Sequence, residues 1–339
     1  MKSLFTSALA LALTLTPGYA MQAAQSSQSQ GQTTQPAQKP PRVLGQPQTR
    51  EEYDAYDAIT KAADLQQRAK LSEDFLQKFP DSGLAPFVHQ IAATTYQQLN
   101  NFEKLAEHGE AALKEIPSPG DAVLLTILSS AYADRGKPDL ALERAEKAAK
   151  GIESLQTPPN IDPAEFAKGK NQLLATIYSA KGVAYLVKAQ EARAKKTASP
   201  PPADPAQKDP PDPNLDLAIT NLNKALELNP KDDFVYYRLG IVYTLKNDAE
   251  NATSAYARSV AIGGNEVVGK MARENLKAVT RAVLKSKEGA DPSDQKITDA
   301  MEQAIFKAKG TLNQPVPPPP AAPPAAPPAV PDQSKPPGF

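Results

Sequence analysis

The sequence predicts an all-α fold in which antiparallel helical hairpins stack side by side between proline-rich segments. Apolar residues recur with helical spacing over most of the chain, and the alternation typical of half-buried strands is almost absent. Hydrophobic residues make up 40 % of the 339 residues and many are alanine, which favours closely packed helices over a Val/Ile sheet core. A pattern of small and aromatic residues also recurs at an interval of 34 residues.

The first twenty residues, MKSLFTSALALALTLTPGYA, predict a secretory signal peptide. Lys2 supplies the positive start, the apolar run from Leu4 to Leu15 is too short to cross a bilayer comfortably, and Ala20 ends a small-residue cleavage pattern. Retention of this segment as a membrane anchor is the alternative. We therefore expect an exported chain, periplasmic or secreted, with no later transmembrane segment. The absence of cysteine is compatible with an oxidising compartment.

Three proline-rich segments are expected to be disordered, because they contain too few large apolar side chains to offset the entropy lost on ordering. They are residues 21–49, 197–214 and 315–339, and they hold most of the 34 prolines. The chain between them is therefore free to be helical. The last segment is expected to form an extended polyproline II tail.

Start and stop signals delimit the expected helices. The sequence Asp162-Pro163-Ala164-Glu165 is typical of a helix N-terminus, and Asp212 or Asn214 can cap a helix that begins near Leu215. After the last hairpin, an amphipathic helix over 265–283 fits a terminal cap, and a short helix is expected at about 293–309. Stop signals occur at Phe79–Gly83, Pro117–Gly120, Asn229-Pro230 and Gly263-Gly264.

The most regular repeat lies in the stretch YYRLGIVYTLKNDAENATSAY, residues 236–256. An aromatic residue, a leucine, a glycine and a tyrosine share one helix, and an alanine and a further tyrosine follow in the next. Small residues let two antiparallel helices approach closely, and the tyrosines fill the space beside them. The residues with these roles are Tyr236, Leu239, Gly240, Tyr243, Ala252 and Tyr256.

The same second-helix pattern occurs 34 residues earlier, in LAITNLNKALELNP. The first helix that pairs with it is expected at Tyr178, Gly182 and Tyr185, although Lys181 stands where the other repeat has leucine. Tyr185 is 33 residues from the alanine that opens the second-helix pattern, where the repeat expects 9. The 24 extra residues include the segment 197–214, which is therefore interpreted as an insertion within one hairpin. The second-helix residues are Ala218, Leu222, Ala225 and Pro230.

These motifs resemble the tetratricopeptide repeat (TPR), whose 34-residue hairpin carries aromatic-x2-Leu-Gly-x2-Tyr, then Ala-x3-aromatic, then proline. The resemblance covers about five hairpins over residues 50–264. It implies a TPR solenoid over 50–284, including the insertion and the capping helix, followed by a short helical extension over 285–314. The more degenerate copies occupy residues 51–82, 85–117 and 121–150.

The resemblance also implies a binding groove, because in TPR proteins the first helix of each hairpin lines a concave surface. Some TPR proteins hold a terminal carboxylate there through Lys, Asn and Arg. Here the corresponding positions are neutral, with Arg238 as the one strong cation nearby, so no carboxylate clamp is expected. The candidate groove residues are Gln90, Thr94, Gln97, Thr126, Ser130, Ser179, Val183, Tyr237, Arg238, Ile241 and Thr244. The same positions also include Phe87, Val123, Ala133, Thr176, Leu186 and Phe234.

No catalytic or cofactor-binding signature is present: the sequence has no P-loop, no G-x-S-x-G, no H-E-x-x-H and no dinucleotide fingerprint. Cysteine is absent and the only histidines are His89 and His108, so we expect no metal site and interpret both as surface or hydrogen-bonded helix residues. Charge is balanced at 38 basic and 38 acidic residues, without a Lys/Arg cluster interleaved with aromatics, so nucleic acid is not an expected partner.

The expected function is an exported, non-enzymatic scaffold that binds a protein or peptide in the concave groove, without a cofactor. The groove positions are polar in the N-terminal half, which suits hydrogen bonds to an extended backbone, and more apolar in the C-terminal half. The alternative is a structural spacer of the cell envelope, which acts through the proline-rich tail 315–339.

Overall fold

The structure is a computed structural model that describes residues 42–118, 120–197 and 212–312. These residues form twelve α-helices and no strand, so the predicted all-α class is confirmed for the described chain. The expected signal peptide, the tail 315–339 and most of the segments 21–49 and 197–214 lie outside the described residues. The helices are α1 (Arg50–Lys61), α2 (Leu65–Lys78), α3 (Ala85–Gln98), α4 (Phe102–Leu113), α5 (Ala122–Asp134), α6 (Pro138–Ser154), α7 (Pro163–Thr197), α8 (Pro213–Leu228), α9 (Asp233–Leu245), α10 (Ala249–Ile262), α11 (Glu266–Glu288) and α12 (Asp294–Thr311).

Side-chain caps begin the helices where the sequence expects them. The Asp162 carboxylate accepts hydrogen bonds from the backbone N–H groups of Ala164 and Glu165, at 2.9 and 3.1 Å. At the start of α8 the cap is Asp212, whose Oδ1 accepts from the Asn214 N–H at 2.9 Å, and Pro213 is the first helical residue. The helix therefore begins two residues before the expected position, and residues 212–214 belong to it instead of to a disordered segment.

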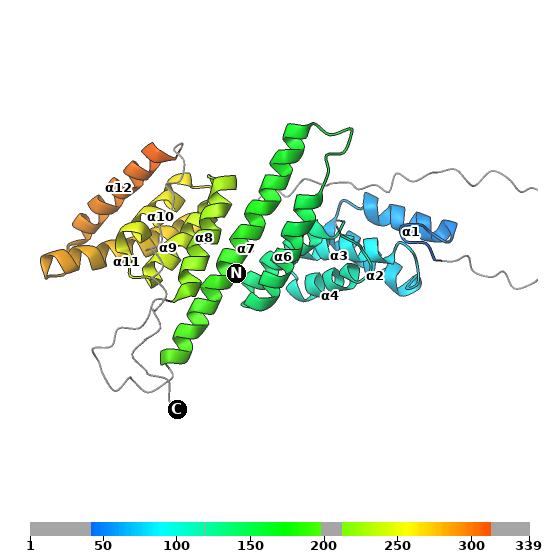
Figure 1. Ribbon diagram of the computed structural model, residues 1–339, viewed down its shortest axis with the longest axis horizontal. Coiled ribbons are helices and arrows are strands. Elements are labelled where there is room, and N and C mark those ends of the chain that lie inside the picture. Colours follow the sequence, from blue (N-terminus) through cyan, green and yellow to red (C-terminus); the bar gives the residue numbers. More distant parts are fainter. Residues whose placement is uncertain (1–41, 119, 198–211, 313–339) are drawn as a thin grey trace, which may run out of the picture.

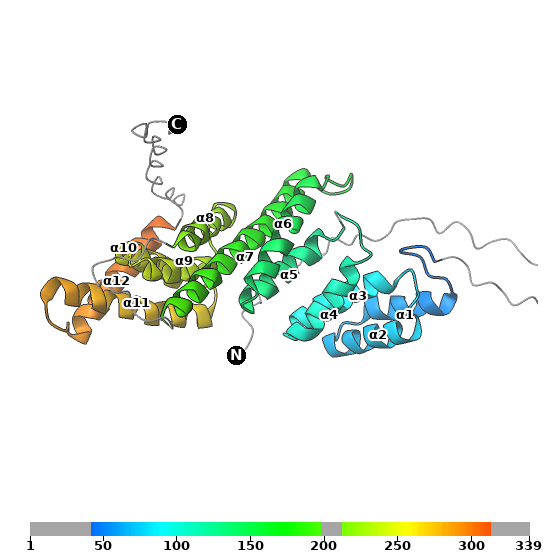
Figure 2. The ribbon, with the colours of Figure 1, turned by 60° about the horizontal axis from the view of Figure 1, so that its bottom comes forward.

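The helices pair in chain order, and the pairs follow one another along the long axis of the molecule (Figure 1). The pairs are α1 with α2, α3 with α4, α5 with α6, α7 with α8, and α9 with α10. Figure 2 shows the same order from a second side, from α1 and α2 at one end to α11 and α12 at the other. Helix α11 packs on α9 and α10, and α12 packs on α10 and α11, so these two helices cover the end of the stack.

Small residues lie at the contacts between paired helices. A Cβ atom at Gly240 of α9 would overlap the ring of Tyr256 in α10, and one at Gly182 of α7 would lie 2.6 Å from Cγ of Leu222 in α8. Leu222 and Tyr256 are both fully buried, so neither can move aside without disturbing the core. The pairing of α7 with α8 across the proline-rich insertion is the one that the residue spacing predicts.

Most residues expected to pack the hairpins together are buried, although the degree varies. Pro230 is exposed, because it follows the end of α8 at Asn229 instead of lying within the helix. Three tyrosines are partly exposed and lie at the edge of the core: Tyr178, Tyr185 and Tyr243. The buried members are Gly182, Ala218, Leu222, Ala225, Tyr236, Leu239, Gly240, Ala252 and Tyr256.

Three hairpins have the same type of turn between their two helices. Shortly after α3, α5 and α9 ends, one residue adopts a left-handed conformation. These residues are Asn100, Gly136 and Asn247, with φ of 60°, 67° and 59°, respectively. In each hairpin the next backbone N–H donates, over 2.9 Å, to the carbonyl of a tyrosine five residues earlier, which is the Schellman arrangement. The donor and acceptor pairs are Asn101 and Tyr96, Lys137 and Tyr132, and Asp248 and Tyr243. These three helix pairs therefore have turns of the same backbone geometry.

Part of the N-terminal segment expected to be disordered is ordered. Residues 42–49 lie against the turn between α2 and α3, where the Gly45 N–H donates to the Gly83 carbonyl at 2.8 Å. The Arg42 guanidinium pairs with Glu115 at 2.6 Å, and the Gln48 N–H donates to the buried Glu52 carboxylate at 2.9 Å. These polar contacts replace the apolar core that the segment lacks.

Helix α7 is the longest element and crosses the middle of the molecule in Figure 1. It spans 35 residues because it continues past Tyr185 to Thr197, so much of the inserted length before residue 197 is helical. Helix α11 likewise continues to Glu288, five residues beyond the expected end. Within the described ranges, no helix combines the length and apolar character needed to cross a bilayer.

Candidate functional site

The candidate binding surface is formed by α3, α5, α7 and α9, and we call it the inner face. Each of these helices packs on the next one of the set, and α9 also packs on α11. In the described part of the chain, neighbours among α4, α6, α8 and α10 do not pack closely on one another. At the C-terminal end of the stack, α10 packs on α12 as well.

Arg238 of α9 joins three helices of the inner face. Its guanidinium donates to Oγ of Ser179 in α7 at 2.8 Å and to Oδ1 of Asp134 in α5 at 2.7 Å. It also lies 3.9 Å from the centre of the Phe234 ring, within the range of a cation–π contact. Only 11 % of the Arg238 side chain is exposed, and its charge is paired with Asp134, so it is not available to an anionic ligand.

Burial divides the candidate groove residues into two groups. The first group is buried. Val183 and Tyr237 lie in apolar clusters, and the Thr126 hydroxyl donates to the Ala122 carbonyl. Ser179 is buried against Arg238. Their side chains pack the helices together and have almost no surface to offer a ligand. The candidates that keep exposed surface are Gln90, Thr94 and Gln97 on α3, Ser130 on α5, and Ile241 and Thr244 on α9. Of the other residues at these positions, Ala133 and Leu186 are buried, and Phe87, Val123, Thr176 and Phe234 are partly exposed.

The α3 end of the inner face carries hydrogen-bonding groups. Gln90 and Gln97 lie seven residues apart on one side of the helix, and neither side-chain amide has a partner among the described residues. Thr94 lies between them, and its hydroxyl donates to the Ile91 carbonyl at 2.9 Å, which leaves its oxygen as an acceptor. These three side chains therefore offer uncharged donors and acceptors to a ligand.

The α9 end of the inner face has a hollow of about 370 Å³ where α9 and α10 meet α11. Thr244, Asn247, Ala252, Val279, Val283 and Lys287 are among the residues that line it. Most of the lining is aliphatic, so the hollow suits an apolar side chain, with polar groups at its edge.

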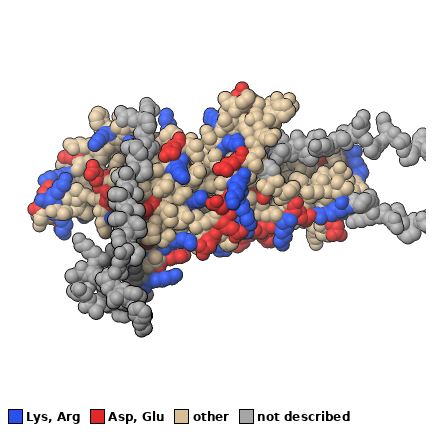
Figure 3. Space-filling model, viewed as in Figure 1, with Lys and Arg blue, Asp and Glu red and all other residues tan. Residues whose placement is uncertain are grey.

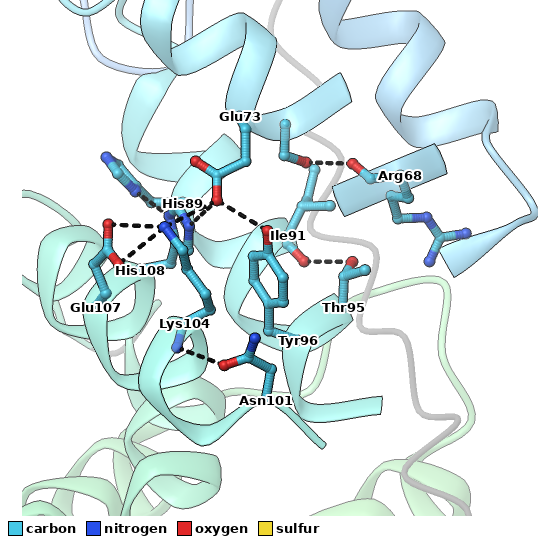
Figure 4. A network of polar contacts seen from close by, with 11 residues as sticks. Arg68, Glu73, His89, Ile91, Thr95, Tyr96, Asn101, Lys104, Glu107 and His108 are labelled. Atoms are coloured by element: carbon cyan, nitrogen blue, oxygen red, sulfur yellow. Dashed lines mark hydrogen bonds and ion pairs between the residues drawn. The ribbon is translucent and has the colours of Figure 1, made fainter. Parts of the chain in front are cut away.

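A second polar cluster joins α2, α3 and α4 (Figure 4). His89 Nδ1 of α3 lies 2.9 Å from His108 Nδ1 of α4, and His108 Nε2 lies 3.1 Å from Oε1 of Glu73 in α2. The Tyr96 hydroxyl donates to the same Glu73 oxygen at 2.9 Å, and its ring stacks on His108 with centres 5.5 Å apart. His108 is only 2 % exposed, whereas His89 is partly exposed.

The cluster changes the acidity of its members. Burial, followed by the nearby His108, lowers the pKa of His89. Burial alone would raise the pKa of Glu73, but hydrogen bonds from Tyr96 and His108 outweigh it and hold that pKa below its usual value. Burial and the hydrogen bond to Glu73 raise the pKa of Tyr96 to about 12.

The contact between the two histidines was not predicted from the sequence, where each was interpreted separately. Helical spacing contains a signal for it: His89 lies four residues before Ala93, and His108 four residues before Ala112, and both alanines are fully buried. Each histidine therefore lies on the side of its helix that faces the core. Asp134 was also missed, because its partner Arg238 is 104 residues away.

Acidic and basic side chains are interspersed over the face shown in Figure 3, in line with the balanced charge of the whole sequence. In the part of the chain that the structure describes, no three His, Cys, Asp or Glu side chains are grouped so that they could hold a metal ion. No family model matches the chain, and no curated protein matches it significantly.

Proposed function

We propose that this chain is an exported, non-enzymatic scaffold of the TPR type, whose inner face binds an extended segment of a partner protein. The observation that carries the proposal is the uncharged hydrogen-bonding row on α3, formed by Gln90, Thr94 and Gln97, which nothing else in the described chain occupies. The repeated Schellman turns and the glycine contacts between paired helices support the TPR interpretation.

The chemistry of the inner face favours a particular kind of ligand. The free amides of Gln90 and Gln97 each provide both a donor and an acceptor, as a peptide backbone in extended conformation requires. An apolar side chain of the ligand fits the hollow lined by Thr244 and Val283. The pairing of Arg238 with Asp134 makes recognition of a terminal carboxylate the weaker hypothesis.

The test replaces the two free amides without changing the shape of the side chains. In the double variant Gln90→Glu/Gln97→Glu each NH₂ donor becomes a carboxylate oxygen, so we expect recovery of partners from an extract of the native organism to fall at least about tenfold. The matched control is Gln66→Glu/Gln77→Glu, which makes the same chemical change at two exposed positions of α2, outside the inner face.

Equal recovery by both double variants would contradict binding at the inner face. Circular dichroism of each variant checks that the helices are intact, since exposed Gln→Glu changes are expected to alter stability by less than about 0.5 kcal/mol. The alternative of an envelope spacer depends on the tail 315–339, which the described residues do not include.

A further inference from the structure

We infer that the contact between His89 and His108 is an acid-sensitive latch, which holds α3 and α4 together and opens when both imidazoles are protonated. The latch lies in the second hairpin and reaches α2 of the first hairpin through Glu73 (Figure 4). The inference stands on the geometry of these side chains and does not require the proposed function.

The positions of the protons follow from the acceptors around His108. A neutral imidazole carries one N–H donor and one acceptor nitrogen. The Glu73 carboxylate can only accept, so His108 Nε2–H donates to it across 3.1 Å, and His108 Nδ1 is then an acceptor. His89 Nδ1–H therefore donates to His108 Nδ1 across 2.9 Å, and the two neutral rings must be opposite tautomers.

The contact tolerates one added proton but not two. After one proton is added, one Nδ1 still donates and the other still accepts, and the Glu73 carboxylate lies against the pair at His108 Nε2. A second proton leaves an N–H group on both Nδ1 atoms, so neither ring can accept the hydrogen bond between them. Two N–H groups of two cations would then face each other at 2.9 Å, and His108 is too buried for water to separate them.

The charged side chains that surround the two histidines are all paired. On α2, Glu73 faces His108 and also pairs with Lys104 of α4 at 3.3 Å. Lys104 pairs in turn with Glu107 at 3.1 Å. After α4, Glu115 is paired with Arg42, and Glu110 on the opposite side of α4 is paired with Arg144. Tyr96 of α3 donates to Glu73. These carboxylates favour protonation of one of the two imidazoles. Each carboxylate already has a cationic or hydroxyl partner, so none is free to neutralise a second imidazolium.

The direction of the pH dependence follows from His89. Burial and the neighbouring His108 lower its pKa in the closed hairpin, whereas an opened hairpin restores the ordinary value of about 6.5. The open state therefore binds the proton more tightly. The stabilisation by the contact is complete above about pH 6.5 and is lost between that pH and the lowered pKa of His89. The opening equilibrium shifts by at most about tenfold per pH unit within this interval and does not shift further below it.

Opening would affect the binding surface, because α3 also carries Gln90, Thr94 and Gln97. His89 is the residue directly before Gln90. Acid would thus release the helix that presents the hydrogen-bonding row, while α7 to α12 stay packed in the other half of the molecule.

Nitrogen-15 NMR of the imidazoles in the full chain tests the latch directly, since the chain has only two histidines and both are in the contact. At about pH 8 we expect one ring as the Nε2–H tautomer and the other as the Nδ1–H tautomer. On titration towards about pH 4 we expect two separate protonation steps. The amide signals of α3 and α4 should persist through the first step and be lost with the second.

Two variants separate the latch from general acid unfolding. His89→Gln keeps a side-chain NH₂ that can donate to His108 but cannot be protonated, so the acid loss of the α3 and α4 signals should disappear. Tyr96→Phe removes the hydroxyl from Glu73 and leaves the imidazole pair, so the acid loss should remain. Identical tautomers in the neutral wild type, independent titration of the two rings, or an unchanged acid transition in His89→Gln would each overturn the latch.

Discussion

Gly240 lies where α9 passes closest to the ring of Tyr256, and the missing side chain sets the distance between the two helices. A Cβ atom would overlap a ring that is fully buried, and the ring of Tyr237 in the same helix α9 lies 6.0 Å from it between centres. The glycine is thus required by packing and not by backbone conformation, because Gly240 is helical.

We predict that Gly240→Ala lowers the free energy of unfolding by about 1–3 kcal/mol, because overpacking outweighs the better helix propensity of alanine. Urea denaturation measures the change. Gly269→Ala in α11 is the control, since no heavy atom lies within 4 Å of a Cβ at that position, and it should raise stability by about 0.5–1 kcal/mol. Equal changes in both variants would show that Gly240 is not a contact residue.

The burial and the hydrogen-bond partners of individual side chains in the candidate site were the least predictable features of the structure. The sequence placed Thr126, Ser130, Val183 and Tyr237 at equivalent groove positions, yet only Ser130 keeps exposed surface. Periodicity identifies the side of a helix to within one or two residues, but burial depends on how deeply the next helix is packed. The partners of Arg238 come from two other helices, and no local pattern contains that information.

At the scale of the element, the same type of turn gives three hairpins the same geometry between their two helices. A left-handed residue after the first helix lets the next N–H reach the tyrosine carbonyl, which ends the helix and reverses the chain within a few residues. Gly136 adopts this conformation without strain, whereas Asn100 and Asn247 adopt it at a small cost.

We predict that Gly136→Ala destabilises the protein by about 1 kcal/mol, because alanine is strained at positive φ. A Cβ at Gly136 would have no atom within 4 Å, so the effect isolates the backbone. Asn100→Gly should instead be neutral or stabilising by a few tenths of a kcal/mol. Thermal unfolding of both variants checks this, and a Gly136→Ala protein as stable as wild type would be inconsistent with the left-handed turn.

Helices with strong local signals were predicted well. The Asp162 cap, the stop at Gly263 and the pairing of α7 with α8 follow from residue types and spacing. The extension of α7 to Thr197 and the order of residues 42–49 were not predicted. The first depends on how far good helix formers continue after the packed region, and the second on hydrogen bonds to a turn about forty residues away.

At the scale of the whole molecule, α5 packs on α7 and α7 on α9, so these three helices form one layer. That layer brings residues more than a hundred positions apart in the sequence into contact, through the ion pair of Asp134 and Arg238 at 2.7 Å. Helix α3 contacts α5 at one end of this layer, so the inner face extends from Gln90 on α3 to Thr244 on α9. If the layer did not exist, a partner segment would have no surface along which to extend.

The coupling energy between Asp134 and Arg238 tests this layer most directly. The free energies of unfolding of Asp134→Asn, Arg238→Met and the double variant form a double-mutant cycle. The control cycle combines Asp134→Asn with Arg273→Met. Arg273 lies in α11, is paired with Glu302 and does not contact Asp134. We predict a coupling of about 1–2 kcal/mol for the first cycle and additivity within about 0.5 kcal/mol for the second. Additivity in the first cycle as well would contradict the packing of α5, α7 and α9 into a single inner face.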